Sequence, residues 1–458
     1  MNETSIKLRN TPTKKLFISY LIPSVLGMML MAINILVDGI FVSNGIGPEA
    51  LAGINISVPI FSILLSISLW IGMGGATLYS ISLGQNNIQK ARSIFTQSFI
   101  LVLLIVGVLV ILGLWKQKEL AYLFGANDQI LPYVLDYLHI ILVFGILYVI
   151  ENVLSIFIRN DGNPKLAMLG LITTSLLNIF FNYLFIFVYK LGVSGVAYAT
   201  ALSTAIGLLI LLIHFLRKES VLKFVRLKFE YSIMSDILKI GVPSFIVESS
   251  AAIIIIAYNI TFMHFVGEIG VTAYAVVNYL HVVFLMLFIS IGAALQPIVS
   301  FHYGANLLDR LQGFLKLAVK TGIALGMLIL IVGWVFGDFI VSLFGVTSKE
   351  VSSYLMKGIS MYFIGYLFLA YNLIYAEFYQ AVRKIKLSTI IIVTRSIILF
   401  LPLLWLLPTV FGTDFIWLAF PIAEAITAIA LFIYNHKLKS LSDKNKVVPK
   451  NVPNVLES

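Results

Sequence analysis

Residues 94–114 read IFTQSFILVLLIVGVLVILGL, an apolar run that contains no charged residue. A helix of this length is long enough to cross a hydrocarbon core about 30 Å thick. Runs of the same kind recur along the chain between polar or Gly/Pro-containing segments. The spans we expect lie near residues 16–42, 54–82, 94–114, 132–157, 166–188, 194–216, 236–264, 272–300, 314–336, 352–380, 387–410 and 414–435. The sequence therefore predicts an all-α integral membrane protein with twelve transmembrane helices.

The composition of the whole chain agrees with this prediction. Of the 458 residues, 60% are hydrophobic and 11% are charged, whereas soluble domains have about 25% charged residues. The chain has no cysteine, which excludes disulfides and thiolate metal sites. It also lacks a phosphate-binding GxxxxGK[ST] loop and an HExxH metal motif. We therefore expect neither an enzyme nor an ATP-driven pump, and no cofactor beyond a coupling ion.

The basic residues are distributed unevenly between the two sides of the membrane. With the N-terminus inside, 25 of the 31 lysines and arginines lie in the tails and the even-numbered loops. The positive-inside rule then places both termini in the cytoplasm. One arginine, Arg395, falls inside a predicted span. The net charge of +10 is thus explained by topology, and we expect no nucleic-acid partner.

The two halves of the chain repeat at an offset of about 220 residues, as the matching loop tripeptides Leu123-Phe124-Gly125 and Leu343-Phe344-Gly345 illustrate. Each repeat contains six predicted helices, so both enter the membrane in the same orientation. Such parallel repeats are typical of transporters with a central cavity. We expect an amino-terminal lobe (1–216), a cytoplasmic linker (217–235), a carboxy-terminal lobe (236–436) and a cytoplasmic tail (437–458). The linker is predicted either as an amphipathic segment on the inner leaflet or as a plain connection.

Five carboxylates fall inside predicted spans: Asp38, Glu151, Glu248, Glu377 and Glu424. Each costs about 2.5 to 3.5 kcal/mol at the centre of a membrane helix, so each is a candidate functional residue. A buried acid that is protonated or paired is the competing interpretation for each one. None of the five has a carboxylate at the repeat-equivalent position, which favours different roles for the two lobes.

Amide side chains accompany one of these acids at helical spacing. Asn34 lies four residues before Asp38, and Asn178 lies four residues before Asn182, so each pair shares one helix face. Their oxygens suit a hard cation or a hydrogen-bonded proton site. The simpler alternative is that these asparagines only join helices through hydrogen bonds.

We assign the substrate contacts to the carboxy-terminal half. Glu248 and Asn259 lie eleven residues apart, on nearly the same helix face, and Glu377 lies in an aromatic-rich helix with Tyr371. Carboxylates beside aromatic rings suit a large lipophilic cation, although lipid-facing packing also explains most of the rings. The same set includes Glu424. Arg395 is expected to pair with Glu424 or Glu377, or to extend its guanidinium to the cytoplasmic interface.

Several motifs together resemble those of one transporter family. They are Asn34 to Asp38 followed by Gly39-Ile40-Phe41-Val42, the loop Arg159-Asn160-Asp161-Gly162-Asn163-Pro164-Lys165, the run Asn178 to Phe187, and Gly192-Val193-Ser194-Gly195-Val196-Ala197. This combination, over about residues 12–436, resembles the multidrug and toxic compound extrusion (MATE) family. The similarity is greatest to the bacterial branch with DinF-like and MepA-like exporters.

The resemblance implies a secondary antiporter in a bacterial plasma membrane. Sodium ions or protons would enter while organic cations, including drugs, leave. Asp38 matches the family's ion-coupling acid, with a possible sodium site there, and Asn178 and Thr200 match its polar neighbours. Asn182 departs from the pattern, because many relatives have aspartate there, and Glu151 is expected to compensate.

The mechanism we expect is alternating access. We expect the protein to be a monomer whose binding partners are its substrates and the membrane lipids. Pro23, Gly27 and Pro243 would allow local bending of the helices. Two alternatives stay open: a flippase for lipid-linked oligosaccharide, which a basic cavity would favour, and a channel or non-transporting scaffold, which would not depend on Asp38.

Overall fold

The computed structural model describes residues 3–226, 228–346 and 348–445, with only the backbone for 438–445. In these ranges ten helices are long and apolar enough to cross a membrane, and two bent helix pairs bring the number of spans to twelve. The predicted all-α fold class is confirmed. The elements of the first half are α1 (Glu3–Asn10), α2 (Thr13–Gly45), α3 (Pro48–Gly84), α4 (Ile88–Trp115), α5 (Gln117–Leu123), α6 (Leu131–Val143), α7 (Gly145–Asn160), α8 (Pro164–Tyr183), η1 (Leu184–Val188), α9 (Gly192–Leu212) and η2 (Ile213–Leu216).

The second half repeats much of this order. Its elements are α10 (Tyr231–Phe265), α11 (Glu268–Gly304), α12 (Leu308–Val335), α13 (Gly337–Leu343), α14 (Lys349–Tyr362), α15 (Gly365–Ala381), α16 (Ile385–Val393), η3 (Thr394–Ile398), α17 (Phe400–Phe411), η4 (Thr413–Leu418) and α18 (Ala419–Asn445). The pairs α3/α11, α4/α12 and α5/α13 begin and end at residues that differ by the 220-residue offset. Asn86 and Asn306, also equivalent, both adopt positive φ values of 60° and 57°.

Two of the predicted spans are broken helices rather than continuous ones. The span expected near 132–157 bends by 52° between α6 and α7, and the span near 352–380 bends by 44° between α14 and α15. The second helix of each pair starts at a glycine, Gly145 or Gly365, and these two glycines are repeat equivalents. A β-carbon at Gly365 would overlap the Phe420 ring, so the missing side chain allows the close packing that accompanies the bend.

The connection between the halves packs against the first one. Residues 217–226 and 228–230 are not helical, and α10 begins at Tyr231, earlier than the linker boundary we expected. Val221 is buried and its carbonyl accepts a hydrogen bond from Arg92 Nε (3.0 Å), while the Val225 amide donates to Thr96 Oγ1 (3.1 Å). The described part of the linker is thus a non-helical segment along α4. Residues 446–458 of the expected tail lie outside the described residues.

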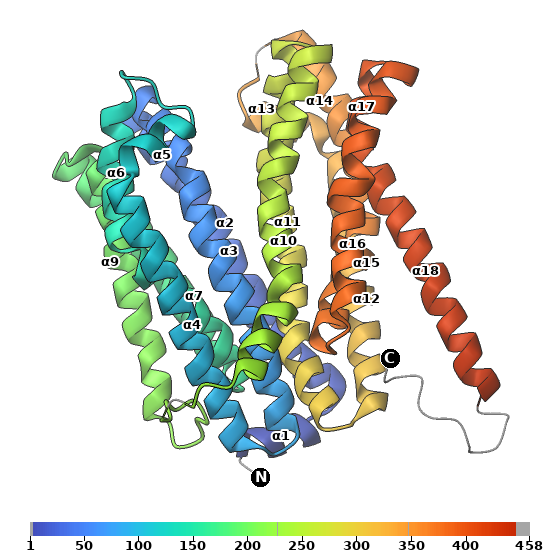
Figure 1. Cartoon of the computed structure of the whole chain (residues 1–458). Helices are drawn as coiled ribbons and strands as arrows, with labels where there is room; N and C mark the ends of the chain where they lie inside the picture. Colours follow the sequence, from blue (N-terminus) through green and yellow to red (C-terminus); the bar gives the residue numbers. More distant parts are fainter. Residues whose placement is uncertain (1–2, 227, 347, 446–458) are drawn as a thin grey trace.

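The helices form two groups that meet at the end of the molecule where α1 lies (Figure 1). Contacts between the groups come mainly from α2 and α3 on one side and α10 and α11 on the other. Trp70 Nε1 donates to the Leu238 carbonyl (2.7 Å), and a β-carbon at Gly74 would lie 3.0 Å from the Gly241 amide nitrogen. We call this region the α1-end seal.

Buried amides complete the α1-end seal. Asn160 Nδ2 donates to Gln296 Oε1 (3.1 Å), and Gln296 Nε2 donates to Thr77 Oγ1 (3.0 Å). Buried polar groups need such partners, so these hydrogen bonds are formed when the two groups of helices are in contact at this end.

Candidate functional site

The structure brings Asp38, Asn34, Asn178, Asn182 and Thr200 into one hydrogen-bonded cluster, which we call the Asp38 cluster. Asn182 Nδ2 donates to Asp38 Oδ1 at 2.8 Å, and Asn34 Nδ2 donates to the same oxygen at 3.2 Å. Asn178 lies 2.8 Å from Asn34 Nδ2 and 3.1 Å from Thr200 Oγ1. Residues from α2, α8 and α9 therefore converge on one carboxylate.

The cluster presents more oxygen atoms than its own hydrogen bonds use. Asn182 Oδ1 is buried without a partner among the described residues. The Asn178 amide fits in two orientations: one accepts from Asn34 and Asn182, and the reverse donates to Asp38 Oδ1 (3.0 Å) and Oδ2 (3.1 Å). Carboxylate, amide and hydroxyl oxygens are ligands for hard cations. A single negative charge among neutral oxygens matches one monovalent cation or one proton.

Local helix geometry explains how the cluster forms. The i, i+4 spacing of Asn34 and Asp38, and of Asn178 and Asn182, places each pair on one face of α2 or α8. The π-helical turn η1 begins two residues after Asn182. Such turns inside α-helices frequently occur at functional sites.

Glu151, on α7, contacts α8 about one helical turn before this cluster. Its carboxylate is buried and accepts a hydrogen bond from Thr174, which precedes Asn178 by four residues. A β-carbon at Gly207 of α9 would lie 2.5 Å from Glu151 Oε1, so the glycine leaves room for the acid. No hydrogen bond joins Glu151 to Asp38 in the described part of the chain. Sequence reasoning missed Thr174, although its spacing continues the Asn178–Asn182 stripe.

The equivalent place in the second repeat contains packed rings instead of amides. Tyr258, which is the equivalent of Asp38, is fully buried, and its ring centroid lies 4.5 Å from that of Tyr274 and 5.1 Å from that of Phe400. Phe420, which corresponds to Thr200, stacks on Tyr362 at 4.5 Å. The polar cluster therefore exists in the first repeat only, as far as the described residues extend.

Glu424 is bound within the second half by other side chains. It forms an ion pair with Arg395, and Asn372 Nδ2 donates to its Oε2 at 2.7 Å. Glu424 is 1% exposed and Arg395 8% exposed. Of the partners considered for Arg395, the structure selects Glu424, and the guanidinium does not extend to the interface. Asn372 was not among the predicted site residues.

The remaining predicted substrate residues are not joined by any hydrogen bond in the described part of the chain. Glu248 lies on α10 one turn beyond Ser244, and Glu377 lies on α15 about one turn before Gln380. Ser244 and Gln380 are hydrogen-bonded (3.2 Å) at the α1-end seal. The two acids therefore lie on neighbouring helices one turn above the seal, and both are partly exposed.

Asn259 and Tyr371 lie farther along the same two helices. Asn259 is three turns beyond Glu248 on α10, about 16 Å along the helix axis at 1.5 Å per residue. The Tyr371 ring lies 4.6 Å from that of Tyr375. The five residues assigned to substrate thus occupy different levels of the carboxy-terminal half.

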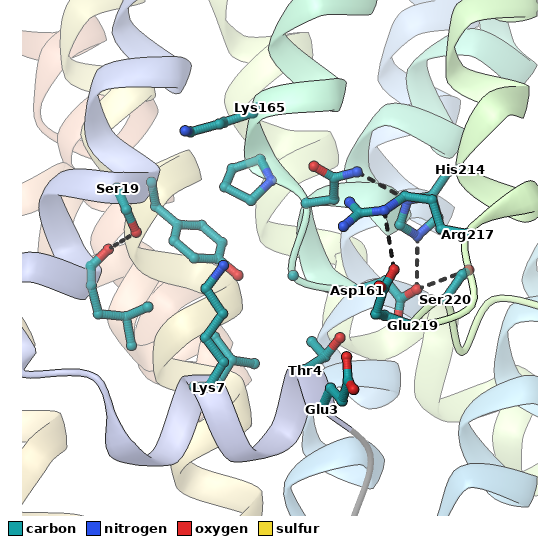
Figure 2. Close-up of a pocket in the computed structure, with 16 residues that line it drawn as sticks. Glu3, Thr4, Lys7, Ser19, Asp161, Lys165, His214, Arg217, Glu219 and Ser220 are labelled. Atoms are coloured by element: carbon teal, nitrogen blue, oxygen red, sulfur yellow. Dashed lines mark hydrogen bonds and ion pairs between the residues drawn. The ribbon is translucent and has the colours of Figure 1, made fainter.

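A separate cavity of about 410 Å³ opens at the α1 end, between α1, α2, α8 and the start of the linker (Figure 2). Asp161 is buried on one side of it and accepts hydrogen bonds from Tyr79 (2.7 Å), from His214 Nε2 (2.8 Å) and from the Val221 amide (3.0 Å). His214 Nδ1 lies 3.3 Å from Asn163 Nδ2. These contacts attach the linker to the first half of the molecule and leave Asp161 well satisfied.

Comparison with known proteins gives a consistent set of matches. A family model described as MatE matches residues 23–184 and 243–406, one segment in each repeat. The multidrug export protein MepA of Staphylococcus saprophyticus is 24% identical over 436 residues, which is 91% of this chain and 92% of that protein. The probable multidrug resistance protein YoeA of Bacillus subtilis is 26% identical over 340 residues, covering 72% and 73% of the two chains.

Solved structures share the fold at low sequence identity. One, described as the outward-facing conformation of a multidrug resistance MATE family transporter, superimposes with a TM-score of 0.90 at 22% identity. It covers 97% of this chain and 100% of that one. A transporter from Pyrococcus furiosus, whose binding pocket is described as having reverse polarity, gives a TM-score of 0.89 at 21% identity and covers 96% and 99% of the two chains.

Proposed function

Because this chain belongs to the MatE family, we propose that it is a secondary antiporter that exports organic cations, including drugs, in exchange for sodium ions or protons. The names of its relatives, a multidrug export protein of Staphylococcus and a probable multidrug resistance protein of Bacillus, support the substrate class. We place it as a monomer in the plasma membrane of a bacterium, with both termini in the cytoplasm.

The Asp38 cluster is the observation that carries this proposal. One carboxylate, three asparagines and a threonine meet between three helices, and one buried amide oxygen has no partner in the described part of the chain. A structural role alone would be complete once every oxygen was satisfied. A site that accepts and releases one cation or one proton needs a spare oxygen and a single negative charge.

The two lobes and the seal between them support alternating access. The excess of lysine and arginine on the α1 side supports an orientation in which the α1-end seal lies toward the cytoplasm. The described conformation is then closed to the cytoplasm. Transport also requires a second conformation in which the seal is open to the cytoplasm. Glu248 and Glu377, one turn above the seal, are positioned to attract a cationic substrate close to where the two lobes meet.

Coupling arises because the ion and the substrate are both cations. Binding of an ion at the Asp38 cluster and binding of a cationic substrate should exclude each other, because an acid neutralised by one ligand attracts the other less. The polar stripe along α8 from Thr174 through Asn178 to Asn182 connects the surroundings of Glu151 to Asp38. In this proposal Glu151 supplies a second acid to the same lobe and compensates for the amide at Asn182.

The competing flippase interpretation is weaker on charge. A lipid-linked oligosaccharide carries phosphates, which favour a basic cavity. Here two acids, Glu248 and Glu377, lie above the seal with one nearby base, Arg159. The acid excess favours a cation as the substrate.

The test is dye efflux from proteoliposomes, with a sodium gradient and a pH gradient imposed separately. We expect one of the two gradients to drive accumulation of a cationic dye and dissipation of that gradient to stop it. Dye movement that is independent of both gradients would indicate a channel or a scaffold and would contradict the proposal.

A further inference from the structure

Arg159 is a buried charge without a partner in the described part of the chain. It lies in the last turn of α7 and is 9% exposed, and its side chain makes no hydrogen bond or ion pair with the described residues. Its Nε atom is fully buried. Buried charges are normally paired or hydrogen-bonded because desolvation is costly. The arginine therefore needs an explanation that packing alone does not give.

Glu377, in the opposite lobe, has the complementary property. Its Oε2 atom is buried and unpaired among the described residues. Its side chain packs on α11 at Gly292, where a β-carbon would lie 2.7 Å from Glu377 Cγ. The absence of a side chain at Gly292 lets the acid lie directly on the helix.

These two groups approach the same part of α11 from opposite lobes. Asn160, the neighbour of Arg159, binds Gln296 at 3.1 Å, and Gln296 lies one turn beyond Gly292 on α11. Each charge lies within the electrostatic field of the other. They are nevertheless too far apart for an ion pair, since none within 4.0 Å joins them. The two opposite charges thus belong to different lobes and lie near the same stretch of α11 while the seal is closed.

We infer that Arg159 is the counter-charge of Glu377 when the lobes are closed at the α1 end, and that a cationic substrate takes the place of Arg159 when they open there. This inference rests on the proposed function. When the lobes open, the separation of Arg159 leaves Glu377 free to attract a cation. When they close again, the returning guanidinium repels the bound cation and promotes its release on the other side. Arg159 is in this sense a positioning residue that acts through Glu377.

The inference makes opposite predictions for the two charges. Arg159→Gln should tighten binding of ethidium to the purified protein in nanodiscs by roughly tenfold, the effect of one unit charge acting over about 10 Å at an effective dielectric of about 20. Glu377→Gln should weaken the same binding. The double variant should resemble Glu377→Gln alone, because Arg159 acts through the acid. Lys165→Gln, an exposed charge at the same end, is the matched control and should leave binding unchanged.

A second measurement reports the closed state and does not depend on binding. The chain has no cysteine, so introduced thiols have no background. Gln85 and Ala305 follow the ends of α3 and α11, where a β-carbon at Gly84 would lie 2.7 Å from the Ala305 amide nitrogen. Gln85→Cys with Ala305→Cys therefore places two thiols across the α1-end seal. Arg159→Gln should lower the fraction that a bifunctional thiol reagent cross-links, whereas Arg159→Lys, which keeps the charge and serves as a check on folding, should restore it. A structural role for Arg159 would not make ethidium bind more tightly.

The outcomes separate this inference from the proposed function. If the parent protein binds ethidium, and Arg159→Gln leaves both its affinity and the cross-linked fraction unchanged, the inference is overturned and the antiporter proposal stands. If the parent protein does not bind ethidium or any other lipophilic cation, both are overturned. Weaker ethidium binding in Arg159→Gln with normal binding in Arg159→Lys would also overturn it, because the sign of the effect would be wrong.

Discussion

Replacing Asp38 by asparagine should abolish ion-driven export while the protein still folds. The hydrogen bonds that Asp38 accepts from Asn182 (2.8 Å) and Asn34 (3.2 Å) end on a single oxygen, Oδ1. An asparagine retains one such oxygen in almost the same place. Asp38→Asn therefore removes the charge from the cluster and preserves most of its hydrogen bonds.

The size of the effect follows from the single carboxylate. One negative charge in the Asp38 cluster binds one monovalent ion, so exchange for one monovalent organic cation is electroneutral. A tenfold ion gradient, about 1.4 kcal/mol, then supports at most about a tenfold substrate gradient. Without the charge, the accumulation ratio should fall to about one.

The assay is steady-state accumulation of a cationic dye in proteoliposomes that have a tenfold ion gradient and no membrane potential. Asp309→Asn, an exposed acid at the start of α12, is the matched control and should behave like the parent protein. A parent ratio near a hundred would indicate two ions per substrate and would refute the one-charge reasoning. An Asp38→Asn protein that still accumulates dye in response to the gradient would refute the assignment of the site.

Three further predictions test other parts of the molecule. Asn182→Asp adds a negative charge 2.8 Å from Asp38 Oδ1, so half-maximal exchange should need a roughly tenfold lower concentration of the coupling ion. The measurement is the transport rate as a function of ion concentration. An unchanged half-maximal concentration would show that the ion binds elsewhere. Arg395→Met removes the ion-pair partner of the buried Glu424 carboxylate, so the substitution should cost about 3 to 5 kcal/mol of stability. The measurement is the thermal unfolding temperature in detergent, which should fall in Arg395→Met and recover when Glu424→Leu is added. If the unfolding temperature does not recover in the double variant, the loss of the ion pair is not the cause of the destabilisation. Gly241→Val places a side chain against a backbone carbonyl of α3 that cannot move aside, so the α1-end seal should not close. Thiol cross-linking across the seal should then drop. Full cross-linking would contradict the described packing.

Much of the fold was predictable because it depends on local properties of the chain. The apolar runs give the spans, and the 220-residue repeat predicts that elements recur in the second half, as α4 and α12 do. The bends between α6 and α7 and between α14 and α15 were not predicted. The sequence pattern of an apolar helix is the same whether the helix is straight or bent. The bend depends on which neighbour packs against Gly145 or Gly365.

The candidate site was predictable where one helix supplies several of its groups. The four-residue spacing of Asn34 with Asp38, and of Asn178 with Asn182, indicated two polar faces, and the family resemblance added Thr200. Their meeting at hydrogen-bond distance depends on the packing of α2 against α8. Spacing within one helix gives no information on that distance.

The sequence by itself determined which residues are charged within the membrane, because an intramembrane acid is visible in any apolar run. Only the tertiary structure decided what each charge does. Arg395 neutralises Glu424, while Arg159 and Glu377, in opposite lobes, form no ion pair in the described part of the chain. The reason is that the energy of a buried charge depends on its distance to a counter-charge. That distance is fixed by contacts between helices far apart in the chain.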